Sequence, residues 1–432
     1  MKFSASNKKM IFALKPVVEV ATKGTNKEAK NAMRVTVKAD KDRLDLIAFG
    51  ERMAIISRPV QPMINEVDYS FVQDGEITVN GYDLMNVLTS FPKEEKLDFT
   101  HDETANSLVV TMVSDSEQLQ SMPLYSDAVE PPRIAAKFQK SSQVKRILLV
   151  EGLGKMIFAT TYRKGDMYTK YMYVRTRCEN NVVTFTSGDG GRFANFEVAQ
   201  MAGATGAVGA NVKDRYDYFF HKDIVPSLCS ILKTPPSEDV ACNEVVIQQA
   251  EKDGSTTPDE VVITCGYVTL VLVNLEVDIE PEWNKLDKLF KLDNPVIITT
   301  KVKDWELPVK GIRATWNEEY QMNHTIHNAR IQMIFGDKII RLEVEGPMKS
   351  KRKVPIFSVA KNADATFACA CNTLYLKEMW ENCISGADLV FEASYAPSGK
   401  APLLVAKDAT QSDAPNNVNR TFTALFSSSL KS

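Results

Sequence analysis

The feature that most constrains the fold of this 432-residue chain is a pattern that recurs about once in every third of its length. Three segments each show a strand, a polar residue, an amphipathic helix, a loop and a further strand. Their helices are predicted to begin near Asn80, His221 and Asn372, which are 141 and 151 residues apart, against 144 for one third of the chain. The sequence therefore indicates three copies of one domain.

Each copy combines helices with antiparallel strands. Alternating apolar and polar residues predict a half-buried hairpin before each helix, at 42–60, 180–198 and 337–356. A second helical segment lies farther upstream in each copy, at 7–23, 140–156 and 301–317. We therefore predict an α+β fold in which every domain has two helices and antiparallel sheets.

Prolines mark the expected boundaries. The predicted domains are 1–130, 131–292 and 293–432, with proline-containing linkers at 129–135 and 291–296. Three further prolines fall inside predicted helices: Pro16, Pro226 and Pro308. Either these helices begin or kink at the proline, or their true limits differ from the predicted ones by several residues.

Composition points to a protein without a membrane segment or a metal site. No run of 18 apolar residues is present, and the N-terminal lysines and short apolar patch are interpreted as mature sequence rather than a signal peptide. The seven cysteines are scattered, which favours reduced thiols in a cytoplasmic protein. The four histidines form no cluster with carboxylates. We therefore expect no cofactor and no metal.

Charge differs between the predicted helices and the rest of the chain. The whole chain has a net charge of −3, yet the six helical segments carry 17 basic and 10 acidic residues. Each helix alone could simply be a solvated face, but the separation of sign predicts a helix-lined surface that meets a polyanion. The basic residues assigned to this surface are Lys8, Lys9, Lys15, Lys140, Lys145, Arg146, Lys222, Lys303, Lys310 and Arg313.

The stretch SGDGGRFANFEV at 187–198 is rich in glycine and lies between two predicted strands. A phosphate-binding loop would need a helix N-terminus directly after it, and none is predicted. A tight hairpin turn is a second interpretation, because glycine accepts positive φ angles. A third is that the turn forms one wall of a protein-binding pocket.

The repeat, GDGGRFA after a strand, EPEWNKL at 280–286 and the initial MKF together resemble the bacterial-type sliding clamp, the β processivity subunit of the replicative DNA polymerase. The resemblance extends along essentially the whole chain. It implies a non-enzymatic processivity factor whose three domains form a crescent. Two such chains would join head to tail as a homodimeric ring, and the helices would line a hole around double-stranded DNA at the replication site.

The same resemblance implies a pocket between the second and third domains that receives short peptide motifs from the DNA polymerase and the clamp loader. Apolar side chains with a few cations suit an extended peptide with aromatic or leucine anchors. Carried over by position, the pocket residues are Tyr171, Gly188, Gly191, Arg192, Phe193, Pro281, Lys285, Leu286, Pro402, Leu403, Phe422, Ala424, Leu425 and Phe426.

Several of these positions depart from the family pattern. Gly188 and Gly191 stand where the family has threonine and histidine, which predicts a wider pocket, and Lys285 replaces an arginine and its bidentate geometry. The chain ends ALFSSSLKS instead of the family's methionine-proline-methionine-arginine-leucine. The preferred peptide is therefore expected to differ from the common bacterial motif. Divergence of this kind would suit a virus-encoded clamp that serves its own polymerase.

Two other classes of function compete with a clamp. An enzyme is disfavoured because no nucleophile elbow, phosphate loop or metal-ligand cluster has the proper context, and the acidic group Asp98, Asp102 and Glu103 is interpreted as solvated surface. The second alternative is a repeat-built structural or interaction protein that does not encircle DNA. Cationic helices against an acidic remainder favour the clamp.

Overall fold

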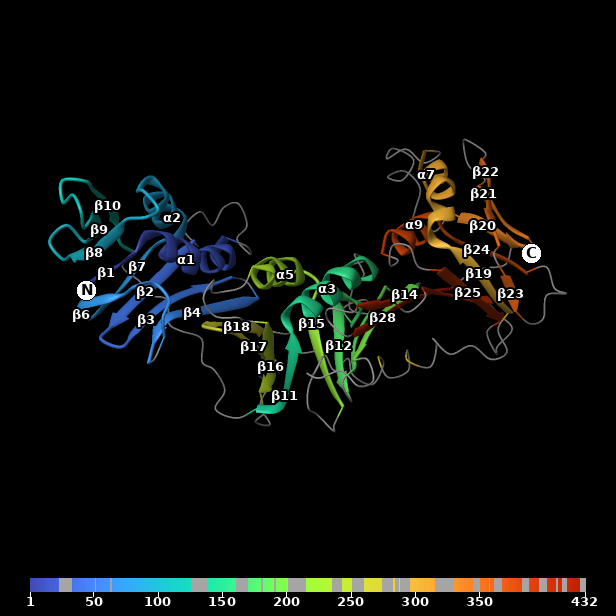
Figure 1. The fold of residues 1–432 in the computed structure, drawn as a ribbon, viewed down its shortest axis with the longest axis horizontal. Helices are drawn as coiled ribbons and strands as arrows, with labels where there is room; N and C mark the ends of the chain where they lie inside the picture. The colour runs from blue at the N-terminus through green and yellow to red at the C-terminus, as the bar shows by residue number, and fades with distance from the viewer. Residues whose placement is uncertain are drawn as a thin grey trace. The chain divides into compact units, whose positions relative to one another are not determined.

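The structure is a computed structural model in which the chain forms two compact units, shown in Figure 1. Unit 1 contains Met1–Glu151 and Gly209–Glu276, and unit 2 contains Gly152–Val208 and Val277–Ser432. The structure describes residues 1–22, 33–50, 52–62, 64–125, 138–160, 170–179, 182–189, 192–200, 215–234, 243–250, 260–273, 283, 287, 296–314, 330–336, 338–344, 350–356, 358–360, 367–382, 388–395, 402–408, 411–413 and 418–427.

The described elements follow the same order three times. The first copy contains β1 (Lys2–Ser6), α1 (Asn7–Thr22), β2 (Arg34–Asp40), β3 (Arg43–Phe49), β4 (Met53–Gln61), β5 (Ile64–Asn65), β6 (Ser70–Gln73), β7 (Gly75–Asn80), α2 (Gly81–Ser90), β8 (Lys96–Asp102), β9 (Ser107–Met112) and β10 (Leu119–Pro123). The second contains β11 (Phe138–Lys145), α3 (Arg146–Met156), the 3-10 helices η2 (Ile157–Ala159) and η3 (Lys170–Met172), β12 (Tyr173–Glu179), β13 (Val182–Gly188), β14 (Arg192–Gln200), β15 (Tyr216–His221), α5 (Val225–Lys233), β16 (Glu244–Ala250), β17 (Glu260–Cys265) and β18 (Val268–Val273).

The third copy contains β19 (Val296–Lys301), the 3-10 helix η4 (Val302–Trp305), α7 (Glu306–Ala314), β20 (Arg330–Phe335), β21 (Ile339–Val344), β22 (Ser350–Pro355), β23 (Ser358–Ala360), β24 (Phe367–Asn372), α9 (Thr373–Asn382), β25 (Asp388–Tyr395), β26 (Pro402–Asp408), β27 (Gln411–Asp413) and β28 (Val418–Ser427). Each copy thus has a strand, a helix, a run of strands, a second helix and closing strands. This order confirms the predicted α+β repeat, whereas the exact domain limits stay predictions.

Antiparallel pairing builds two sheets in each unit. In unit 1 the strand orders are β10-β9-β8-β1-β6 and β11-β16-β17-β18-β4-β3-β2-β7. In unit 2 they are β12-β13-β14-β28-β26-β25-β19-β23 and β22-β21-β20-β24. Two pairings join successive copies. The closing strand β18 pairs with β4 of the first copy, and the closing strand β28 pairs with β14 of the second.

The start of α1 is tied to the end of α2 through one buried amide. The side-chain nitrogen of Asn7, which is fully buried, donates to the carbonyl oxygens of Leu88, Phe91 and Pro92 at 2.9, 3.2 and 3.0 Å. A buried polar group needs such partners because leaving it unsatisfied costs about 1–3 kcal/mol. The two helices of the first copy are therefore held in one arrangement.

Helix starts follow local capping chemistry. The side chain of Asn80 accepts hydrogen bonds from the backbone N–H groups of Tyr82 and Asp83, so α2 begins where the sequence predicted. The third copy shows the same agreement, because α9 begins directly after Asn372. The start predicted near His221 is wrong by four residues, since His221 ends β15 and α5 begins at Val225.

The three prolines have different outcomes. Pro226 lies in the first turn of α5, and Pro308 is the third residue of α7, where a missing N–H costs no intrahelical bond. Pro16 lies inside α1. Among the described helices, none is long and apolar enough to cross a membrane.

The helix predicted over 140–156 begins six residues late. Ser142 and Val144 are buried while Ser141 and Gln143 are exposed, so this part alternates with a period of two and forms β11 rather than helix. Lys140 and Lys145 are therefore on a strand, and their assignment to a helix was wrong.

His221 occupies a buried position at the end of β15. Burial, together with the positive charge of Arg52, lowers the pKa of His221 to about 4. Its side chain is 2% exposed, and the Nδ1 atom lies 3.4 Å from a carboxylate oxygen of Asp223. His221 is therefore neutral at neutral pH.

Candidate functional site

The glycine-rich stretch is a hairpin turn between β13 and β14. The N–H of Asp189 donates to the carbonyl of Arg192 at 3.1 Å, and the N–H of Arg192 donates to the Asp189 carboxylate at 3.0 Å. Strands lie on both sides of the turn, so no helix N-terminus follows that could hold a phosphate. The hairpin interpretation is confirmed; Gly191 lies outside the described residues.

Phe193 fills the space that Gly188 was expected to leave. The two residues are directly opposed in the β13–β14 ladder, and a Cβ atom added at Gly188 would collide with the Phe193 ring. Phe193 is 7% exposed and packs in a T-shaped arrangement with the Tyr171 ring, with 6.0 Å between ring centroids. The prediction that Gly188 widens the pocket is therefore wrong, because glycine here lets an aromatic ring pack onto the backbone.

Arg192 is held by groups of unit 2. Its guanidinium pairs with Glu378 of α9, lies 3.3 Å from the Asp189 carboxylate and donates to the carbonyl of Phe158 at 2.6 Å. Burial raises the pKa of Glu378, and the charge of Arg192 opposes that rise. Nearby, the ammonium of Lys155 donates to the carbonyl of Asn382 at 2.9 Å. Arg192 thus ties β14 to the second helix of the third copy.

Strand pairing brings the expected C-terminal pocket residues beside this turn. Arg192 is opposed to Phe426 and Phe193 to Leu425 across β14 and β28. The same ladder contains Ala424 and Phe422, and β26, which carries Pro402 and Leu403, is the next strand. Segments more than 200 residues apart in sequence therefore meet at one edge of the candidate pocket. For these β26 and β28 residues the backbone position alone is described.

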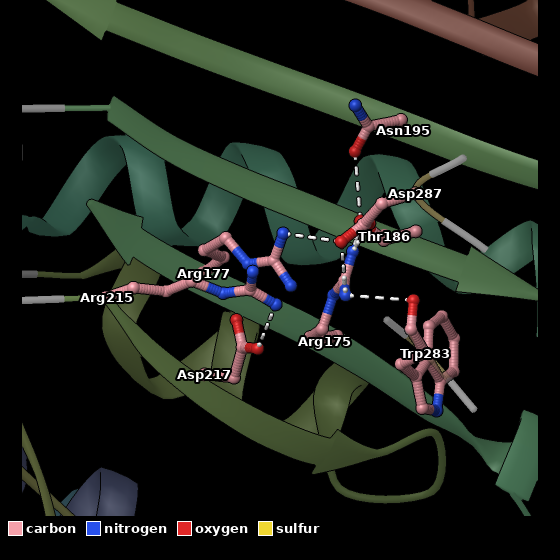
Figure 2. A network of polar contacts seen from close by, with 8 residues as sticks. All are labelled: Arg175, Arg177, Thr186, Asn195, Arg215, Asp217, Trp283 and Asp287. Carbon is pink, nitrogen blue, oxygen red and sulfur yellow. Dashed lines mark hydrogen bonds and ion pairs between the residues drawn. The ribbon is translucent and has the colours of Figure 1, made fainter. Parts of the chain in front are cut away.

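Of the segment EPEWNKL, Trp283 is described, and so is Asp287, the residue that follows the segment. Pro281, Lys285 and Leu286 lie outside the described residues. Figure 2 shows that Arg175 of β12 joins Trp283 and Asp287 to the sheet. Its guanidinium donates to a carboxylate oxygen of Asp287 at 2.5 Å and to the carbonyl of Trp283 at 3.2 Å.

The network also extends to the neighbouring strands of the sheet. Arg175 donates to the hydroxyl of Thr186 at 3.1 Å, and that hydroxyl donates to the side-chain oxygen of Asn195 at 3.0 Å. Arg177 donates to the second oxygen of Asp287 at 2.7 Å. Burial alone would raise the pKa of Asp287, but the hydrogen bonds and charges of Arg175 and Arg177 hold it below its ordinary value.

Sequence reasoning missed this network, which we call the Arg175 anchor (Arg175, Arg177, Trp283 and Asp287). The residues are more than 100 positions apart, and the one available signal was a pair of arginines two positions apart on a strand. The anchor holds Trp283 and Asp287, which flank in sequence the residues Lys285 and Leu286 that the resemblance places in the pocket.

The predicted cationic residues divide into exposed and engaged groups. Lys8 and Lys15 of α1, Lys303 of η4 and Lys310 of α7 are exposed, and Lys310 pairs with Glu306 one turn earlier at 2.6 Å. In unit 1, α1 and α5 lie on the same face of the larger sheet (Figure 1), and Ser230 of α5 donates to Glu19 of α1 at 3.0 Å. Helices of successive copies thus lie side by side there.

Other predicted cations have structural partners. Arg146 donates to the carbonyls of Leu232 and Lys233 and so caps the C-terminal end of α5. Lys9 lies 3.4 Å from the carboxylate of Asp68. Lys222 is in the turn before α5 rather than on it and lies 3.8 Å from Asp223. Arg313 is on α7, and no side-chain placement is described for Arg313 or Lys140.

The helices are less cationic than the sequence predicted. The described α-helices together with η4 contain ten basic and seven acidic residues, against 17 and 10 in the predicted segments. The difference arises because several of the basic residues lie on strands, turns or outside the helix ends. The excess positive charge therefore falls from seven to three.

Comparison with solved structures places this arrangement in a known fold. DNA polymerase III subunit beta from Pseudomonas aeruginosa is 13% identical over 99% of both chains, with a TM-score of 0.74. A DNA polymerase sliding clamp from Caulobacter crescentus is 16% identical over the full length of both chains, with a TM-score of 0.72. The Helicobacter pylori beta clamp in complex with carprofen is 13% identical over the full length of both chains, also with a TM-score of 0.72.

No protein-family model and no curated protein matches the sequence. The fold is that of the DNA clamps, built from α+β repeats. More narrowly, the chain has the three-copy fold of the bacterial polymerase III β sliding clamps along its whole length. This confirms the fold that the resemblance implied.

Proposed function

We propose that the chain is a DNA sliding clamp, a non-enzymatic ring that encircles duplex DNA and tethers a replicative polymerase. The observation that carries the proposal is the full-length match to sliding clamps, with a TM-score up to 0.74 and 99% coverage of both chains. A likeness that left out one copy would not support a ring, because ring closure uses every copy.

Strand topology supports closure by two chains. Successive copies are joined in the same way at two places. In each, the closing strand of the later copy pairs with the strand that follows the hairpin turn in the earlier copy. These pairs are β18 with β4 and β28 with β14. The closing strand of the first copy is β10, and the strand after the hairpin turn of the third copy is β22. Both are edge strands among the described sheets. Two chains joined head to tail through these edges give six copies in a closed ring, in which β10 and β22 are no longer exposed edges.

Nonspecific attraction to phosphates would come from the exposed lysines. Lys8, Lys15, Lys303 and Lys310 lie on the first helical segments of the first and third copies. Lysines that contact phosphates supply affinity without base preference, and that affinity falls as salt rises. The ring would therefore hold DNA by topology and tolerate sliding.

Polymerase and clamp loader would dock through short peptides at the pocket beside the 189–192 turn. The support is the meeting of β14, β28 and β26 there, together with the Arg175 anchor on the neighbouring β12. Because Arg192 already pairs with Glu378, we assign it to the pocket wall rather than to direct peptide contact. Anchoring would rest on apolar residues and on the 281–286 segment.

The ring is tested by mass and by topology. Light scattering should give about twice the 48.2 kDa chain mass at micromolar concentration. Chains reassembled in the presence of nicked circular DNA should co-elute with the circle and be released when one cut makes it linear. The matched control is the same DNA linearised before assembly. A concentration-independent mass of one chain, or equal retention on linear DNA, would remove the proposal and favour an interaction protein that does not encircle DNA.

A further inference from the structure

The edge strand β22 is strongly basic. Lys351, Arg352 and Lys353 are consecutive and exposed, and the side chain of Lys351 is 79% exposed. Arg352 lies against α7, since a Cβ atom added at Gly311 would come within 2.5 Å of its Nε atom. Lys351 and Lys353 share the other side of the strand because side chains alternate. Glu343 on β21 lies 3.2 Å from Lys351 and offsets part of this charge.

The edge strand β10 lies among carboxylates. The strands and turns from β8 through β10 contain one lysine, Lys96, and five acidic residues, Asp98, Asp102, Glu103, Asp115 and Glu117. The turn between β8 and β9 carries Glu103, and the turn between β9 and β10 carries Glu117, and both are exposed. The N–H of Leu124 donates to the carbonyl of Asn106, so the first turn lies beside the C-terminal end of β10. Acidic groups therefore lie at both ends of this edge.

We propose that the opposite charges of these two edges select the partner, which is a second copy of this chain with its β10 edge against β22. This inference rests on the proposed ring. It adds that two β10 edges or two β22 edges repel one another, so charge enforces the head-to-tail arrangement. It also means that a clamp with a different charge pattern on these edges is rejected as a partner.

The direction of strand pairing would place the β22 lysines beside the acidic turns. The pairings of β18 with β4 and of β28 with β14 are both antiparallel. By the same arrangement, the start of β22 lies beside the end of β10. Lys351 then approaches the turn with Glu103, and Lys353 approaches the turn with Glu117.

The test reverses each edge separately and then combines them. One variant carries Lys351→Glu with Lys353→Glu, and the other carries Glu103→Lys with Glu117→Lys. These side chains are exposed, and the residues that shape the turns, Asp102 and Asp115, are kept because they accept backbone hydrogen bonds. A control with Lys2→Glu and Lys41→Glu has the same charge change as the first variant on exposed sites away from both edges.

Sedimentation velocity at low salt measures the dimer dissociation constant. Each edge variant alone should have a dimer dissociation constant at least about 100-fold larger than that of the wild type, because both interfaces of its dimer bring like charges together. An equal mixture of the two variants should return to within about tenfold of wild type, and added salt should shrink all these differences. The control should match wild type.

The outcomes separate the inference from the ring itself. The charge-selection inference is overturned if the edge variants dimerise as tightly as the wild type. It is also overturned if the mixture fails to restore dimers while both variants have the melting temperature of the control. Both results leave the ring in place. A wild-type chain that is monomeric at every concentration overturns the proposed ring, and the inference with it.

Discussion

Replacing Asp287 with asparagine tests the Arg175 anchor most directly. Asparagine keeps the size of the side chain and removes the charge that faces Arg175, whose own side chain is 1% exposed. Removing one partner of a buried ion pair costs about 3–5 kcal/mol, because a charge is left uncompensated. Asp287 is 32% exposed, so water replaces part of the lost contact, and Arg175 keeps its bonds to Trp283 and Thr186. We therefore expect a loss of about 2 kcal/mol.

Hydrogen exchange of the β12 and β13 amides is the appropriate assay, because a chain with several domains lacks a single free energy of unfolding. A loss of about 2 kcal/mol corresponds to roughly 30-fold faster exchange in these strands. The matched control is Asp68→Asn, whose partner Lys9 is 37% exposed and whose own side chain is 58% exposed. This control should change local stability by less than about 0.5 kcal/mol.

The pH dependence of the stability difference shows whether the charge of Asp287 causes it. The folded pKa of Asp287 lies below its ordinary value, so the carboxylate stabilises the fold above about pH 4, and this contribution is lost as pH falls through the depressed folded pKa. The difference between wild type and Asp287→Asn should therefore shrink in acid. An effect below about 0.5 kcal/mol at pH 7, or one of equal size at pH 3, would refute the electrostatic reasoning.

Three further predictions follow from the packing. Gly188→Ala should destabilise unit 2 by about 1–3 kcal/mol, measured by hydrogen exchange of β13 and β14, because the new methyl group collides with the Phe193 ring. The control Gly154→Ala, which adds a methyl group at an open site, should not destabilise it. Glu378→Gln should loosen the contact of Arg192 with α9 and speed exchange in α9, and unchanged exchange would contradict the pairing. Because the pKa of His221 is lowered from 6.5 to about 4, unit 1 should lose up to about 3 kcal/mol as pH falls from 6.5 to 4, and His221→Gln should remove this dependence.

Local patterns predicted much of the fold. The starts of α2 and α9 follow Asn80 and Asn372, and the alternation at 42–60, 180–198 and 337–356 corresponds to hairpins in all three copies. These features depend on residues within a few positions of one another, and a sequence displays such residues directly. The threefold repeat then indicated one domain type used three times.

Residue environments were set by contacts between distant segments. The stretch 140–145 lies in a strand because β16, about 100 residues later, pairs with it. Gly188 is covered by Phe193, and Arg192 is neutralised by Glu378 of the next copy. Sequence patterns could not show these partners, because helix and strand periodicity describe which face is buried and not what covers it.

The sequence by itself determined the α+β class and the three copies, whereas the structure decided that the stretch at 187–198 is a hairpin. The tertiary structure decided which charges remain on the surface. Lys8 and Lys15 stay exposed, whereas Arg146 and Arg175 are used to hold elements together. The physical reason is that a long cationic side chain can keep its charge in water, and is buried only where carbonyls and carboxylates offset the cost of desolvation. Its role therefore depends on partners that folding brings from elsewhere in the chain.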